Sequence, residues 1–194
     1  MTPHCRRLPH LYPDNVPLFL TCRLHGTFPA LMLPPAGTLS SGQAFVWLDR
    51  RLDAGQYGPT WLARADIARI VVASIRKGAE LGHYALAAWV VMPNHVHMLV
   101  TPRISPVHLL KSLKGSTARD ANRVLGRTGE PFWQKESYDH WVRNRSEFEK
   151  IRAYIETNPV KAGLAADPTQ YPWSSAGVEA SLDAARTSAR ATIT

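Results

Sequence analysis

Two histidines separated by a single residue, His95 and His97, are the side chains whose spacing most directly suggests chemistry. They lie in the largely apolar stretch 88–100, which is interrupted by Pro93 and Asn94. Because alternate residues of a strand point to the same face, the two imidazoles would project together while the intervening valine packs on the other face. Imidazole is a common metal ligand, so the pair predicts part of a divalent-metal site. The same pattern also fits two partly buried histidines bonded to backbone carbonyls.

A second pair of polar residues, Tyr154 and Asn158, lies four residues apart in a segment with helical periodicity. Residues at this spacing share one face of a helix. A tyrosine can act as a covalent nucleophile, and a nearby cation would favour its phenolate. A divalent ion on His95 and His97 would polarise a phosphate, and Asn158 could supply a third, neutral oxygen ligand. The ordinary alternative is an amphipathic tyrosine that packs with its hydroxyl at the surface.

Hydrophobic periodicity predicts the elements that would position these side chains. Strands are expected at 18–25, 84–91 and 96–101, with short extended aromatic pieces at 132–134 and 137–143. Helices are expected at 42–52, 66–77, 106–125 and 146–158. Together they predict an α+β fold, in which a central antiparallel β-sheet is flanked by α-helices. The hairpin that carries the histidines should lie at its centre.

The ends of the helix that carries Tyr154 have their own signals. Ser146 with Glu149 forms a candidate capping box at its start. Pro159 disfavours helical geometry in the residue before it, which predicts that the helix ends near Asn158.

The chain has 194 residues, of which 45% are hydrophobic, and this is enough for one substantial core. We expect one domain over residues 1–175, with 28–58 as an insertion or loop region and 176–194 as a disordered tail. No apolar run is long enough for a membrane span, and the N-terminus lacks the apolar core of a secretory signal. The two cysteines, Cys5 and Cys22, fit a reducing compartment, so we expect a cytoplasmic protein.

The charge balance favours a polyanionic partner. Lys and Arg total 23 against 15 Asp and Glu, a formal net charge of +8. Neutralising phosphates releases counterions from nucleic acid, although basic charge alone does not establish such a partner. The candidate DNA-contacting side chains are Arg6, Arg7, Lys111, Lys114 and Arg143. For the helix at 106–125, an ordinary solvated face is the competing interpretation.

Several motifs, taken in order, resemble a known family. The stretch 92–100, Met-Pro-Asn-His-Val-His-Met-Leu-Val, looks like the metal-binding strand of the HUH single-tyrosine transposases. Downstream, Phe-Trp-Gln at 132–134, Tyr-Asp-His at 138–140, Tyr-Ile-Glu-Thr-Asn-Pro-Val-Lys-Ala-Gly-Leu at 154–164 and Tyr-Pro-Trp-Ser-Ser at 171–175 resemble the REP-associated tyrosine transposases. The resemblance covers roughly residues 84–175 and assigns no role to 28–58.

The resemblance implies a ferredoxin- or RRM-like HUH endonuclease fold and a specific reaction. His95 and His97 would be metal ligands, Tyr154 the nucleophile, and Asn158 the third ligand or an active-site polar group. The tyrosine would attack single-stranded DNA near a hairpin or repeat and leave a 5′-phosphotyrosine and a free 3′-hydroxyl, a step that reverses without ATP. The implied ion is Mg²⁺ or Mn²⁺, although two imidazoles also suit zinc.

The resemblance also implies the partners and leaves alternatives open. We expect single-stranded or hairpin DNA as the partner, association with the nucleoid, and a monomer rather than a homodimer. A replication-initiator nickase shares the histidine pair and the tyrosine. A catalytically silent DNA-binding regulator, or a metal-dependent hydrolase that uses Tyr154 only for positioning, would have the same motifs.

Overall fold

The computed structural model describes residues 16–27, 41–55 and 57–178. Its centre is a four-stranded sheet in the order β2-β3-β1-β4, in which every pair of neighbours is antiparallel. The strands are β1 (Leu18–Arg23), β2 (Tyr84–Val91), β3 (His95–Pro102) and β4 (Tyr138–Trp141). The helices of the described chain are α1 (Ser41–Asp53), α2 (Ala65–Glu80), α3 (Pro106–Val124) and α4 (Arg145–Lys161). This confirms the expected α+β fold with a flanked antiparallel sheet.

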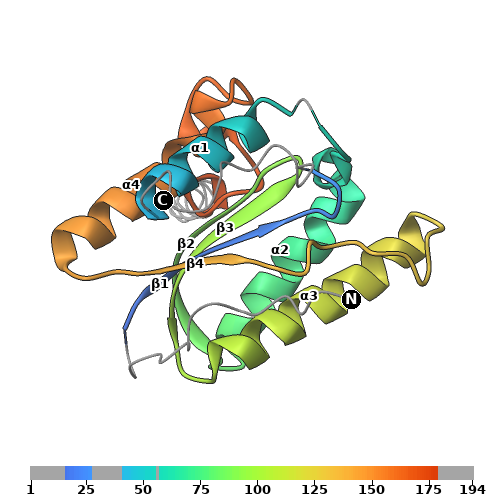
Figure 1. Cartoon of the computed structure of the whole chain (residues 1–194), viewed down its shortest axis with the longest axis horizontal. Helices are drawn as coiled ribbons and strands as arrows, with labels where there is room; N and C mark the ends of the chain where they lie inside the picture. Colours follow the sequence, from blue (N-terminus) through green and yellow to red (C-terminus); the bar gives the residue numbers. More distant parts are fainter. Residues whose placement is uncertain (1–15, 28–40, 56, 179–194) are drawn as a thin grey trace, which may run out of the picture.

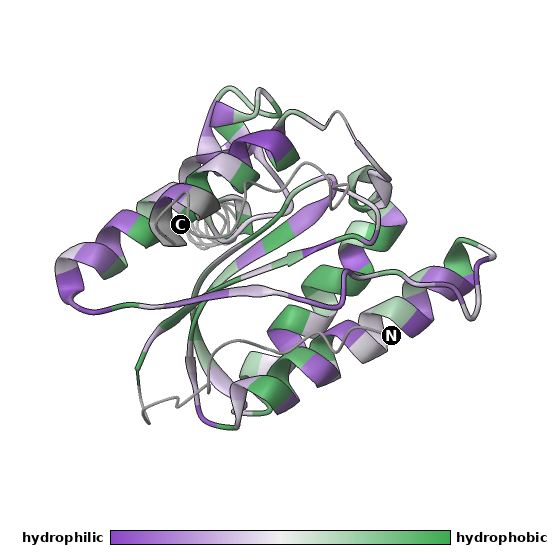
Figure 2. Cartoon of the chain, in the orientation of Figure 1, coloured by the Kyte–Doolittle hydropathy of each residue, from purple (hydrophilic) through white to green (hydrophobic). Residues whose placement is uncertain are grey.

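The helices cover both faces of the sheet, α2 and α3 on one side and α1 and α4 on the other (Figure 1). Strand alternation explains the two layers, because Leu18, Leu20 and Cys22 join the core under α2 and α3, whereas Phe19 belongs to the layer under α4. The hydropathy colouring shows apolar and polar residues alternating along α2 and α3 (Figure 2). The apolar ones face inward, as in the fully buried Ile67.

The register of the sheet decides which side chains meet the histidine pair. β1 pairs with β3 so that Thr21 lies opposite His97 and Arg23 opposite His95. The hairpin between β2 and β3 is closed by a hydrogen bond from the backbone N–H of Met92 to the carbonyl of His95, 2.8 Å long. Both imidazoles therefore project from the face that α1 and α4 cover, and Thr21 projects beside them.

The start of α4 differs from the capping box expected at Ser146. Its N-cap is Asn144, whose Oδ1 accepts a hydrogen bond from the backbone N–H of Glu147 at 2.9 Å. The Glu147 carboxylate in turn accepts from the backbone N–H of Arg143 at 2.7 Å. Asn144 and Glu147 have the same three-residue spacing as Ser146 and Glu149 in the expected capping box. The helix therefore begins two residues earlier than expected, at an equivalent pair.

The end of α4 also differs from the expected stop near Asn158. The helix continues to Lys161 with Pro159 inside it. Pro159 removes its own bond from the helix ladder, but the last turn is still closed by the N–H of Ala162 bonding to the carbonyl of Asn158 at 3.0 Å. Gly163, at φ +71°, then ends the helix in the left-handed conformation that glycine adopts readily.

Two further expectations concern the segments outside the core. The helix expected at 42–52 is α1, within the region that we had set apart as insertion or loop. Residues 176–178, which belong to the expected tail, form a short helical turn, in which the N–H of Val178 bonds to the carbonyl of Ser174 at 3.2 Å. The remaining tail, 179–194, and the segment 28–40 lie outside the described residues. No helix in the described ranges is long and apolar enough to cross a membrane.

Replacing the cap of α4 should distinguish the two candidate start sites. Asn144→Ala removes the acceptor for the N–H of Glu147, and we expect the free energy of unfolding to fall by about 1 kcal/mol. Ser146→Ala, within the first turn, should change it by less than about 0.5 kcal/mol. Urea denaturation followed by circular dichroism measures both. A larger loss for Ser146→Ala would contradict the assigned cap.

Candidate active site

The two histidines of β3 lie side by side in the interior. Both side chains are fully buried, and their Nε2 atoms are 3.1 Å apart. Their ring centroids are 4.6 Å apart, and the planes are inclined by 69°. The Nε2 atoms of the two rings thus converge on one point, as the spacing of the two residues in a strand predicted.

The hydrogen bonds made by the Nδ1 atom of each ring affect whether its Nε2 atom carries a proton or a free lone pair. The side-chain amide of Asn94 donates to the carbonyl of Leu52 at 2.8 Å, which turns its Oδ1 towards Nδ1 of His95 at 2.7 Å. Nδ1 of His95 must then carry the proton, and Nε2 presents a lone pair. The Thr21 hydroxyl, 2.9 Å from Nδ1 of His97, can accept a hydrogen bond from it in the same way. Such partners are typical of imidazoles that bind metal through Nε2.

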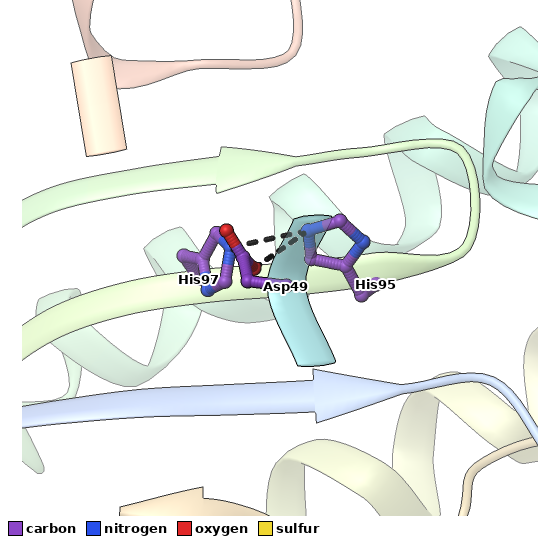
Figure 3. A group of neighbouring side chains, drawn as sticks. All are labelled: Asp49, His95 and His97. Atoms are coloured by element: carbon purple, nitrogen blue, oxygen red, sulfur yellow. Dashed lines mark hydrogen bonds and ion pairs between the residues drawn. The ribbon is translucent and has the colours of Figure 1, made fainter. Parts of the chain in front are cut away.

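A carboxylate from α1 joins the pair (Figure 3). Oδ1 of Asp49 lies 3.0 Å from Nε2 of His97 and 3.7 Å from Nε2 of His95. This oxygen is buried and accepts no hydrogen bond within the described chain. Sequence reasoning missed Asp49, because it lies in the segment 28–58 that the family pattern leaves without a role. The signal that could have found it is the acidic pair Asp49 and Asp53, one helical turn apart.

Burial and mutual charge determine the ionisation of the group. Burial, together with the neighbouring His97, lowers the pKa of His95 to about 3. Burial alone would raise the pKa of Asp49, but the attraction of the imidazoles outweighs it and the net shift is downward. Burial and the charge of Asp49 raise the pKa of Asp53 to about 7. At neutral pH the group therefore offers a neutral His95 imidazole and an ionised Asp49 carboxylate.

These donors fit a divalent cation. The ligand atoms of Asp49, His95 and His97 all lie within 4.8 Å of one another. Ligands at about 2.1 Å from an ion and at right angles to each other are about 3.0 Å apart, and tetrahedral ones are about 3.4 Å apart. The measured separations run from 3.0 to 3.7 Å. A cation held by both rings and by the carboxylate would satisfy all three ligand atoms at once.

Tyr154 of α4 meets the histidines on the same face of the sheet. Its ring centroid lies 5.7 Å from that of His97, with an interplanar angle of 62°. Phe19 packs edge-on against it, with centroids 6.2 Å apart. A cavity of about 590 Å³ opens between α1 and α4 beside this group. It is lined by Val46, Asp49, Arg50, Asp53, Ala54, Tyr154, Lys161 and Ala162.

Two other side chains of α4 act on Tyr154. The side-chain amide of Asn158 donates to the Tyr154 hydroxyl at 3.2 Å, and the ammonium of Lys161 lies 4.9 Å from the centre of the ring. Oδ1 of Asn158 is buried and accepts no hydrogen bond among the described residues. The role of Asn158 as a metal ligand stays a prediction, and its observed contact is with the phenol.

The predicted DNA-contacting residues are not gathered at this cavity. Lys111 is exposed on α3, on the other side of the sheet. Lys114 donates to the carbonyls of Gln134 at 2.9 Å and Lys135 at 3.2 Å, so it ties α3 to the segment before β4. Arg143 is exposed next to the start of α4. Arg6 and Arg7 lie outside the described residues.

Comparison with known proteins places this arrangement in a family. Residues 61–158 match the family model for IS200-like transposases. The chain belongs to this transposase family. The match spans α2, the hairpin with both histidines, and α4 as far as Asn158, whereas Asp49 falls outside it. A search of curated protein sequences found no match.

Solved structures of related shape agree with the fold. A REP-associated tyrosine transposase bound to a REP hairpin is 18% identical, with a TM-score of 0.50, over 86% of this chain and 80% of that one. A protein of Deinococcus radiodurans R1, provisionally assigned as a transposase, is also 18% identical, with a TM-score of 0.42, over 78% of this chain and 97% of that one. At this identity the first likeness supports the architecture, and the second is too distant to add to it.

Removing the amide that orients His95 should weaken metal binding. Asn94→Ala takes away the acceptor for Nδ1 of His95 and the donor to the carbonyl of Leu52. We expect the affinity for Mn²⁺, measured by titration calorimetry, to fall about 10- to 100-fold. Asn122→Ala is a matched control, because Asn122 is also buried but donates to the carbonyl of Glu130 at 2.6 Å, from a helix on the other face of the sheet. Equal losses in both variants would contradict the orienting role.

Proposed function

We propose that this transposase is a metal-dependent transesterase for single-stranded DNA. It would nick and rejoin DNA at hairpin or repeat sequences through a 5′-phosphotyrosine intermediate. The observation that carries the proposal is the position of Tyr154, whose ring lies 5.7 Å from His97 and lines the same cavity as Asp49. The hairpin bound to the REP-associated transposase of similar fold supports a hairpin as substrate.

In this proposal the metal site is held by His95 and His97. Mg²⁺ or Mn²⁺ bound there would supply Lewis-acid polarisation of the phosphate that is attacked. Both imidazoles are fixed from behind by Asn94 and Thr21, so they need no rearrangement to act as ligands. Asn158 stays a candidate third ligand, and its amide already holds the phenol oxygen.

The Tyr154 hydroxyl would form the new bond to phosphorus, while the bond from phosphorus to the 3′-oxygen breaks. The phenol loses its proton, and the departing 3′-oxygen gains one to become a hydroxyl. The amide of Asn158 donates to the attacking oxygen and thereby stabilises negative charge on it. Because one phosphodiester replaces another, a 3′-hydroxyl can reverse the step and rejoin DNA without ATP.

The charges around the cavity would favour binding of a DNA phosphate only when the metal ion is bound. Asp49 and Asp53 would repel a DNA phosphate, whereas Arg50 and Lys161 line the same cavity and would attract it. A divalent ion beside Asp49 would turn the local balance in favour of the phosphate. We therefore propose that metal binding comes before productive DNA binding. Such a substrate places the protein with the nucleoid in the cytoplasm, and a single chain carries every residue that the proposal requires.

Loss of the nucleophile should remove a covalent product. Wild-type protein incubated with Mn²⁺ and end-labelled hairpin DNA should give a protein–DNA adduct that survives denaturing electrophoresis. Tyr154→Phe keeps the ring contact with His97 but lacks the hydroxyl, so the adduct should disappear, as it should with a chelator. Tyr57→Phe, at an exposed tyrosine, is the matched control and should keep the adduct.

The other readouts of this experiment identify the competing functions. Cleaved DNA without an adduct would indicate a hydrolase in which Tyr154 only positions the substrate. DNA that is bound but not cut would indicate a regulator that acts by occupancy. Cleavage and adduct formation without any rejoining would indicate an initiator-type nickase. The first two results would contradict the transesterase proposal, and the third would contradict its rejoining step.

The basic side chain of Lys111 provides a separate test of DNA contact. It is exposed on α3, whereas Lys114 is committed to two backbone carbonyls, so only Lys111 can be removed without disturbing the fold. If Lys111 contacts a phosphate, Lys111→Ala should reduce the slope of log affinity against log salt by about 0.7 for single-stranded DNA. Lys77→Ala, at an exposed lysine of α2 near Glu80, is the control. An unchanged slope in Lys111→Ala would exclude the contact.

A further inference from the structure

We infer that Asp49 of α1 is a direct ligand of the metal ion that His95 and His97 hold, so that the ion fastens α1 to the sheet. The inference rests on the metal site of the proposed function and adds a ligand to it. The family match covers residues 61–158 and so contains no counterpart of Asp49. Neither the histidine strand nor the tyrosine helix supplies this third donor; it comes from an element that precedes both.

The position of the Asp49 carboxylate carries the inference. Its Oδ1 is 3.0 Å from Nε2 of His97 and 3.7 Å from Nε2 of His95, so it faces both nitrogens at once. The residue is 4% exposed, and this oxygen accepts no hydrogen bond in the described part of the chain. A buried carboxylate oxygen without a donor is costly, and a shared cation removes the cost. Figure 3 shows the carboxylate between the two rings.

A hydrogen bond between α1 and the hairpin holds Asp49 in this position. The carbonyl of Leu52 accepts the hydrogen bond of the Asn94 amide at 2.8 Å, which anchors the end of α1 at the hairpin. Asp49 lies three residues before Leu52, on an adjacent part of the same helical surface. The same Asn94 side chain orients His95. One buried amide therefore sets the relative position of an imidazole ligand and of the helix that carries the carboxylate.

Asp53 offers an internal comparison, because it lies one turn further along α1 and lines the same cavity. Its Oδ1 is 3.8 Å from Nε2 of His95, and it does not belong to the group of mutually close ligand atoms. Its side chain is 19% exposed, compared with 5% for Asp49. Oδ1 of Asp53 is also buried without a hydrogen-bond partner among the described residues, so the 3.0 Å approach of Asp49 to His97 is what distinguishes the two carboxylates. The pair is therefore a matched test of coordination against general electrostatics.

The test measures metal binding by the full chain without DNA. Titration calorimetry with Mn²⁺ should show that Asp49→Asn weakens binding at least about tenfold, more than Asp53→Asn does. His97→Ala tests the proposed site itself and should abolish binding. If Asp49→Asn binds Mn²⁺ as wild type does while His97→Ala does not, Asp49 is no ligand but the histidine site stands. If wild type binds no Mn²⁺, both proposals fall. Equal losses in the two aspartate variants would also overturn the inference.

A loss of metal binding could also result from poor folding, so a second variant tests for a gain of affinity for a different metal. Asp49→Cys replaces a hard oxygen donor by a soft thiolate, and should shift the preference of the site from Mn²⁺ towards Cd²⁺. A thiolate bound to Cd²⁺ gives a charge-transfer band in the ultraviolet. All variants are made in a Cys5→Ser background, so that the remaining native thiol is Cys22, buried in the core on the other side of the sheet. We expect the band in Asp49→Cys and not in Asp53→Cys or in the background protein. Absence of the band from folded Asp49→Cys would overturn the inference.

Discussion

Two fully buried imidazole nitrogens face each other across 3.1 Å, a contact that requires either a proton shared between the rings or a cation held by both. In this chain the neighbouring side chains favour a cation between the two rings. Asn94 and Thr21 occupy the Nδ1 atoms, and Asp49 adds a buried anionic oxygen to the same point. The low pKa of His95, about 3, makes its protonation a poor solution. The group is therefore suited to hold a cation, and the rest of the candidate site surrounds it.

The antiparallel sheet brings the parts of this site together. Pairing of β1 with β3 places Thr21 behind His97 and Phe19 within 5.3 Å of its ring. Phe19 also packs edge-on against Tyr154, so the same strand supports the imidazole and the phenol. α4 then crosses this face, where Ile155 packs in the core while Tyr154 and Lys161 line the cavity. Strand alternation and helical periodicity are thus enough to orient both halves of the site.

These regular features are why much of the molecule could be predicted from its sequence. The histidine face follows from the period of a strand, and the shared face of Tyr154 and Asn158 follows from the period of a helix. Asp49 could not be found in this way, because its contact with His97 depends on how α1 docks and not on a local pattern. The start of α4 was misplaced for a related reason. Asn144 and Ser146 both have a glutamate three residues on, and the interaction of Glu147 with His140, at 2.9 Å, favours the earlier one.

The burial of the histidines also constrains how a DNA strand could reach them. Both side chains are fully buried, and Asp49 is nearly so. The described cavity that includes Asp49 and Tyr154 lies between α1 and α4, so a phosphate would approach through this opening. If the ion fastens α1 to the sheet, it also sets the width of the opening, so metal binding would determine substrate access as well as reactivity.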